Sequence, residues 1–101
     1  MGNPYRGEVM LTVNGESRVM RLSLGRLAML EARLGDDSLV ALVERFESGA
    51  FSARDLLALL AAGLGEDEAR MAEAEIAGGP LEAAKAAAQL LKLTFQLPGT
   101  A

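Results

Sequence analysis

Asn14 and Gly15 stand between two short segments in which hydrophobic and polar residues alternate. An Asn-Gly pair in this setting is the strongest short-range signal of a β-hairpin, because both central residues of its turn take a positive φ angle. A two-residue loop also fixes the register and places Met10 opposite Val19. We therefore predict an antiparallel hairpin over residues 7–23.

The predicted register sorts the hairpin side chains onto two faces. One face is apolar and has to pack on the rest of the chain; it holds Val9, Leu11, Val13, Met20 and Leu22. The other face is polar, apart from the apolar pair formed by Met10 and Val19. A two-stranded hairpin is only marginally stable by itself. It must therefore lie on helices or be extended by another chain.

The remainder of the chain predicts short helices. Ser23 and Ser52 are suitable N-caps, and Asp36 or Asp37 can cap another helix. Residues 56–64 have no polar side, which is typical of a central helix. The predicted spans are 24–34, 37–48, 52–64, 67–77 and 80–97. We expect one domain over residues 1–101, of the α+β class, with an N-terminal two-stranded antiparallel β-hairpin packed on four to five short α-helices.

The composition argues against an enzyme. The chain has no histidine and no cysteine, so the commonest general base and the commonest metal ligands are missing. No phosphate-binding glycine motif is present. The acidic cluster Glu66-Asp67-Glu68 suits a helix start better than a calcium loop. We expect no catalytic residue, no cofactor and no metal.

Net charge and hydropathy limit the classes of partner that the protein can have. The net charge of −4 disfavours nucleic acid, which requires a basic patch. The longest uncharged apolar run, residues 56–65, has about half of the roughly 20 residues that span a bilayer, and residues 1–7 lack the apolar core of a signal peptide. We expect a cytoplasmic protein that contacts other proteins, and neither nucleic acid nor membrane.

Two surfaces are candidates for such contacts. Strand edges accept further strands, and the Met10–Val19 pair marks the hairpin face, although charged strand residues can also blunt an edge. The last helix is apolar over most of its circumference, so one flank either lies in the core or faces a partner. The predicted partner-binding residues are Met10, Val19, Arg18, Arg21, Leu90, Leu93 and Leu97. Both surfaces also allow a homo-oligomer.

Several stretches of the chain carry a resemblance to a known family. They are NPYRGEV at 3–9, the Asn14-Gly15 turn, LSLGRLAMLE at 22–31, GAFSARDLL at 49–57, AGL at 62–64, and Leu90-Leu91 with Phe95. In their order and spacing they resemble the gene transfer agent family proteins, which are similar to tail assembly chaperones of tailed phages. The resemblance extends from Asn3 to about Leu97 and is looser between Gly65 and Gly79.

The resemblance implies a role in building a phage-like tail, encoded in a gene transfer agent or a prophage. Such chaperones are expected to coat the tape-measure protein and to help recruit tail-tube subunits. The alternative is a structural component of the tail particle. A small enzyme would need a cleft with convergent polar groups, and a regulatory adaptor also remains open.

Overall fold

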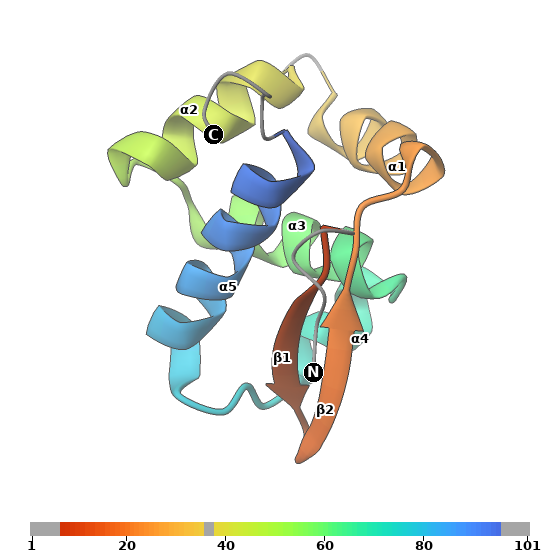
Figure 1. Cartoon of the computed structure of the whole chain (residues 1–101), viewed down its shortest axis with the longest axis vertical. Coiled ribbons are helices and arrows are strands. Elements are labelled where there is room, and N and C mark those ends of the chain that lie inside the picture. Colours follow the sequence, from red (N-terminus) through yellow and green to blue (C-terminus); the bar gives the residue numbers. More distant parts are fainter. Residues whose placement is uncertain (1–6, 36–37, 96–101) are drawn as a thin grey trace.

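The computed structural model describes residues 7–35 and 38–95 (Figure 1). Within these ranges a two-stranded antiparallel hairpin is followed by five helices, so the predicted α+β class is confirmed. The elements are β1 (Val9–Val13), β2 (Glu16–Met20), α1 (Leu24–Leu34), α2 (Leu39–Ser48), α3 (Ala53–Leu64), α4 (Glu68–Glu73) and α5 (Gly79–Thr94).

The hairpin has the register that its turn predicts. Met10 pairs with Val19, and the flanking pairs follow in step. Asn14 and Gly15 have φ angles of 51° and 81°, in the left-handed region that these two residue types tolerate best. The apolar face is buried, as expected, through Val9, Leu11, Val13, Met20 and Leu22.

Helix α3 is the central element, as its lack of a polar side predicts. Residues 58–64 are all buried, and the helix packs against α1, α4, α5 and β2. Figure 1 shows it crossing the middle of the molecule with the other elements around it. Because every side of its C-terminal half meets another element, apolar side chains are stabilised by burial all round.

Gly63 brings the last turn of α3 close to two neighbours. A Cβ at this position would lie 2.8 Å from Leu90 Cδ2 and 3.3 Å from Met20 Cβ. Leu90 and Met20 are both 0% exposed, and side chains in a close-packed interior cannot move aside freely. Because Gly63 has no side chain, α3 can contact both the hairpin and α5 at this point.

One carboxylate ties the start of α3 to α2. Ser52 and Asp55 form a capping box, in which each side chain accepts a hydrogen bond from the backbone N–H of the other residue. The Asp55 carboxylate also accepts hydrogen bonds of 2.8 and 2.9 Å from the Arg45 guanidinium. The hydrogen bond from Arg45, more than any other interaction, lowers the pKa of Asp55 below its ordinary value of 3.8.

The start of α2 differs from the prediction. Ser38 is the N-cap, and its hydroxyl accepts a hydrogen bond of 3.0 Å from the backbone N–H of Ala41. Asp36 and Asp37, the predicted caps, lie outside the described residues. A serine caps a helix as well as an aspartate does, so residue type does not favour the two predicted aspartates over Ser38.

The predicted helix over residues 67–77 is too long. It ends after Glu73, and Ile76 forms an antiparallel bridge with Val13. Two backbone hydrogen bonds of 2.8 and 3.1 Å flank this bridge, and the Asn14 side chain accepts another from the same segment at 2.8 Å. These contacts with β1 override the helical propensity of the segment, and they cover the edge of β1 beside the turn.

Helix α5 starts one residue earlier than predicted. It ends at Thr94, with Phe95 as its C-cap, whereas the prediction extended it to residue 97. Pro80 occupies its first turn, as expected for a residue without a backbone N–H. The residues that it buries lie on one side: Ala83, Ala86, Ala87, Leu90 and Leu91.

We predict that Gly63→Ala destabilises the protein although alanine favours helix. The added methyl group overpacks the contact with Leu90 and Met20, which costs about 1–3 kcal/mol. Gly25, also helical, has no atom nearer than 3.9 Å to an added Cβ, so Gly25→Ala should gain roughly 0.5–1 kcal/mol. Urea denaturation followed by circular dichroism measures both variants. A stabilised Gly63→Ala variant would show that the contact is loose.

We predict a stability contribution of Asp55 that depends on pH. Because its folded-state pKa is lowered, the contribution is complete above the unfolded-state pKa, near 4, and disappears as the pH falls through the folded-state value. Asp55→Asn should therefore lower the free energy of unfolding by about 1–2 kcal/mol at pH 7, and by much less at pH 2. An equal loss at both pH values, measured by urea denaturation, contradicts this.

Candidate protein interaction surface

The outer face of the hairpin brings together three of the predicted partner-binding residues. Met10 and Val19 form a cross-strand pair, in which Val19 is 44% exposed and Met10 is half-buried. Arg21 is exposed and follows Val19 by two residues, so it projects to the same face. We call Met10, Val19 and Arg21 the hairpin surface.

Arg18 does not join the hairpin surface. It pairs with Leu11, on the opposite face of the hairpin. Its guanidinium lies 3.4 Å from the carboxylate of Glu66, and both side chains are about one-third exposed, at 34% and 27%. A partly exposed pair of this kind contributes about 0.2–1 kcal/mol. Arg18 therefore helps to hold the hairpin on the turn between α3 and α4.

The predicted contact through Leu90 is wrong for this structure. Leu90 is 0% exposed, because α5 packs on the last turn of α3, where Leu90 meets Gly63. Leu93 is half-buried and packs against the same core. Leu97 lies outside the described residues. The flank of α5 that carries Leu90 thus serves the core.

The strand edges are partly closed within the described part of the chain. Residues 74–77 cover the edge of β1 beside the turn. At the far end of β2, the backbone N–H of Arg21 donates a hydrogen bond of 2.9 Å to the Gly63 carbonyl. Alternation then directs the backbone groups of Ser17 and Val19 to the outer edge of β2. So short an edge limits uncontrolled strand pairing.

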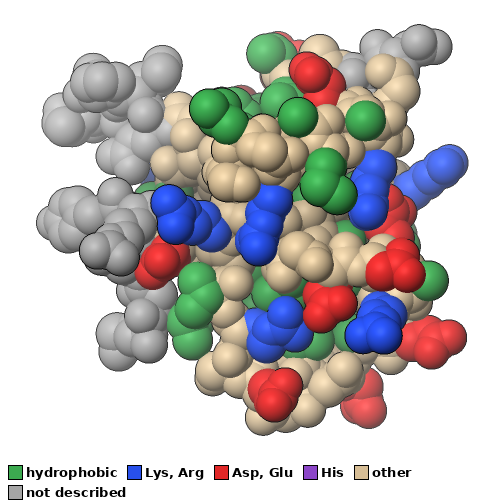
Figure 2. Space-filling model, turned by 90° about the vertical axis from the view of Figure 1, so that its right-hand side faces the viewer, with side chains coloured by type: hydrophobic (Ala, Val, Ile, Leu, Met, Phe, Trp, Pro, Cys, Tyr) green, Lys and Arg blue, Asp and Glu red, His purple; other side chains and the backbone are tan. Residues whose placement is uncertain are grey.

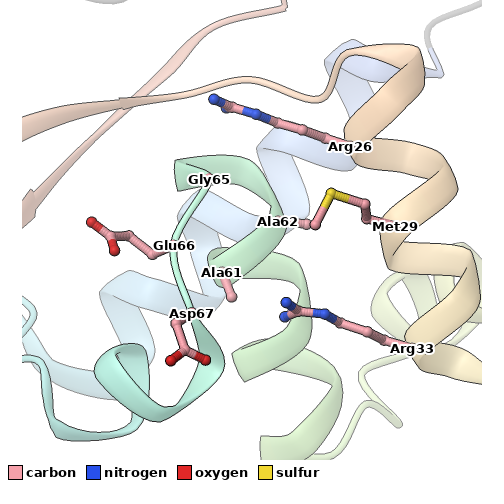
Figure 3. Close-up of a pocket in the computed structure, with 8 residues that line it drawn as sticks. All are labelled: Arg26, Met29, Arg33, Ala61, Ala62, Gly65, Glu66 and Asp67. Atoms are coloured by element: carbon pink, nitrogen blue, oxygen red, sulfur yellow. The ribbon is translucent and has the colours of Figure 1, made fainter.

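A cleft of about 510 Å³ lies between α1 and the turn that joins α3 to α4. Arg26, Met29 and Arg33 share one side of α1, and Figure 3 shows both guanidinium groups reaching toward the turn on either side of Met29. The opposite wall consists of Ala61, Ala62, Gly65, Glu66 and Asp67. Figure 2 shows the side of the molecule that carries α1 and α4, where acidic and basic side chains alternate around isolated hydrophobic ones.

The arginines of this cleft hold α1 in place. Arg26 donates hydrogen bonds to the carbonyls of Gly63 and Arg21, at 2.8 and 3.1 Å, and so satisfies a carbonyl at the C-terminal end of α3. Arg33 pairs with Glu68 of α4 at 2.8 Å. The cleft is thus crossed by polar contacts that join α1 to three other segments.

The acidic residues of the cleft also form contacts within the protein. Glu66 pairs with Arg18, and the Asp67 side chain accepts a hydrogen bond from the backbone N–H of Ala69 at 3.3 Å, as an N-cap of α4. The apolar exception is Met29, which is 58% exposed. The charged groups of this cleft are thus committed to contacts within the protein. Among the described residues, no group of acidic residues could hold a metal ion.

Some exposed hydrophobic residues were not indicated by the sequence pattern. The leucine spacing of α1 places Leu24 with Leu27 and Leu30, yet Leu24 is 85% exposed because it is the first residue of the helix. Met29 and Val40, 58% and 66% exposed, stand at helix positions that no periodicity distinguishes. Isolated apolar residues of this kind are normal at a protein surface.

Comparison with known proteins identifies the family of the chain. Residues 6–97 match the model of a family described as "Phage tail tube protein, GTA-gp10". The chain belongs to this family. It is of the tail assembly chaperone type found in phages and gene transfer agents, whose members are typically not enzymes, so the resemblance found in the sequence is confirmed. No curated protein and no solved structure matches the chain.

None of the described helices combines the length and the hydrophobicity that crossing a membrane requires.

We predict that Arg26→Gln destabilises this family member more than Arg33→Gln. Arg26 satisfies backbone carbonyls, and losing hydrogen bonds from a charged group costs about 1.5–3 kcal/mol. Arg33 forms an ion pair with both side chains about one-third exposed, for which we expect a loss of about 0.2–1 kcal/mol. Thermal and urea denaturation of the two variants measures the difference. Equal losses would mean that Arg26 contributes only through its charge.

Proposed function

We propose that the protein is a tail assembly chaperone that binds tape-measure and tail-tube proteins through its hairpin surface. The family match over residues 6–97 is the observation that carries this proposal. The family match indicates the process, which is tail assembly. The partly exposed Met10–Val19 pair offers a surface suited to another protein.

The hairpin surface has the composition of a protein contact. Met and Arg are enriched in such interfaces, and a few apolar or arginine side chains usually carry most of the binding energy. The backbone bond from Arg21 to Gly63 and the pair between Arg18 and Glu66 fix the hairpin on the helices. A fixed surface loses little conformational entropy when a partner binds.

The alternative function is a structural component of the tail particle. The description of the family, which names a tail tube protein, favours this alternative. The two functions differ in what finished particles contain. A chaperone is absent from purified particles or present in traces, whereas a structural component is present in fixed proportion to the other tail proteins. Quantitative mass spectrometry of purified particles distinguishes them.

We predict that Met10→Lys combined with Val19→Lys weakens capture of tape-measure and tail-tube proteins by roughly tenfold or more. The two lysines place charge in an apolar contact. Because the pair lies on the outer face, the folded protein should lose no more than about 1 kcal/mol. Pull-down with the tagged full chain measures capture, and light scattering reports whether the same face joins two copies.

The matched control carries the same residue changes elsewhere. Met29 and Val40 are exposed on α1 and α2, away from the hairpin. Met29→Lys combined with Val40→Lys should leave capture unchanged. Unfolding of the hairpin double variant would mean that Met10 and Val19 belong to the core. Undiminished capture by a folded hairpin variant would exclude this surface as the binding site.

A further inference from the structure

A pocket of about 560 Å³ lies between β1 and α5. It is lined by four consecutive strand residues, 9–12, and by one side of α5. Since alternate side chains of a strand point to opposite faces, a pocket that all four residues line runs along the edge of β1 rather than over one face. The other edge of β1 is paired with β2, as Figure 1 shows. The pocket thus lies where a third strand of the sheet would pair.

The chain itself begins a third strand at this edge and then leaves it. Ile76 forms the bridge with Val13, and the N–H of Ala77 donates a hydrogen bond of 3.1 Å to the Thr12 carbonyl. The chain then turns away at Gly78, whose φ angle of 86° lies in the left-handed region, and continues into α5. Within the described residues, no strand covers the edge of β1 beyond Ala77.

Three backbone groups on this edge have no hydrogen-bond partner among the described residues. The bond from Ala77 shows that the backbone groups of Thr12 point away from β2, and alternation places those of Met10 on the same edge. The Thr12 carbonyl is bonded to Ala77, whereas the N–H of Thr12 and both groups of Met10 are not bonded. Unpaired groups in a row along a strand edge are a template for the backbone of another extended segment.

A parallel strand can bond all three groups without displacing Ala77. In parallel pairing, the added residue opposite Leu11 donates to the Met10 carbonyl and accepts from the Thr12 N–H. The added residue opposite Val9 accepts from the Met10 N–H. In antiparallel pairing, the acceptor for the Thr12 N–H would stand opposite Thr12, where Ala77 already lies. The free groups therefore favour a parallel strand that ends or turns before Ala77.

The walls of the pocket indicate the side chains of such a segment. A residue opposite Met10 projects to the hairpin surface, where an apolar side chain extends the Met10–Val19 pair. The residues before and after it project toward α5, where the lining side chains include the buried Ala86 and the exposed Glu82 and Lys85. Because these two charges are opposite in sign, small neutral side chains suit this wall.

We propose that the edge of β1 binds an extended segment of another protein by parallel strand addition, with an apolar residue opposite Met10 and a small residue on either side of it. This inference rests on the proposed function, because it describes how a tail protein engages the hairpin surface. In strand addition the backbone supplies affinity and the alternate side chains supply specificity. Removing a single backbone donor therefore distinguishes it from a contact between side chains alone.

Proline substitutions remove one donor from either edge of the hairpin. Thr12→Pro removes the N–H that faces the pocket and keeps the carbonyl that bonds Ala77. Ser17→Pro is the matched control, because Ser17 is the cross-strand partner of Thr12 and its N–H faces the opposite edge. Proline is tolerated where a strand N–H faces away from the neighbouring strand. We expect Thr12→Pro to lower capture of tape-measure and tail-tube proteins by roughly fivefold or more, and Ser17→Pro by less than about twofold.

A synthetic peptide tests the same edge without a tail protein. The probe is lysine-alanine-valine-alanine-lysine with blocked ends, titrated into the ¹⁵N-labelled full chain. N-methylation of its second alanine removes the donor to the Met10 carbonyl, whereas N-methylation of its valine removes an N–H that faces away from β1. We expect the first change to lower affinity by roughly fivefold or more and the second by less than about twofold. Amide chemical shifts should change most at Met10 and Thr12.

Equal effects of the two prolines, equal effects of the two methyl groups, or shifts confined to other residues would each overturn the proposal. A larger effect of the valine change would indicate antiparallel pairing and contradict it as well. Circular dichroism checks the fold of both proline variants, and the peptide series decides if Thr12→Pro does not fold.

Failure of strand addition is distinguishable from failure of the proposed function. If tail proteins are captured equally by the two proline variants, strand addition fails and the chaperone proposal stands. If the peptides behave as expected but no tail protein is captured, strand addition stands and the chaperone proposal fails.

Discussion

The contact of the last turn of α3 with β2 and α5 is the constraint on which the other parts of the fold depend. At Gly63 the helix has no side chain, and Met20 and Leu90 meet its backbone from two sides. Both of these side chains are fully buried. Because interiors are close-packed, this contact sets how near the hairpin and α5 can approach, and with them the position of every surface that they carry.

Polar contacts at both ends of α3 also hold the neighbouring elements in place. At its C-terminal end, α3 offers the Gly63 carbonyl to the backbone N–H of Arg21 and to the Arg26 guanidinium. At its start, Asp55 joins the capping box to Arg45 of α2. Carbonyls and N–H groups at helix ends lack partners within the helix. In this protein those groups fasten neighbouring elements, so satisfying α3 also positions α1, α2 and the hairpin.

This arrangement leaves the hairpin surface and an apolar groove exposed, on different elements. The hairpin surface is small, apolar at its centre and bordered by Arg21, and its outer position follows from the burial of the opposite face. The groove between α3, α4 and α5 is lined by nonpolar residues.

The sequence by itself determined the features that depend on neighbours in the chain. The Asn14-Gly15 turn set the register, Ser23 and Ser52 set two helix starts, and the lack of a polar side in residues 56–64 identified the central helix. These are local signals, because a turn or a cap is completed within a few residues. The family resemblance was likewise contained in the order and spacing of residues.

Tertiary structure alone decided which apolar surfaces stay exposed. Helix α5 has apolar residues on two flanks, and the close approach at Gly63 chose the one that buries Leu90. The predicted helix over residues 67–77 became shorter because Ile76 pairs with Val13, far away in the chain. In both cases the local sequence allows two solutions, and packing against a distant segment selects one of them.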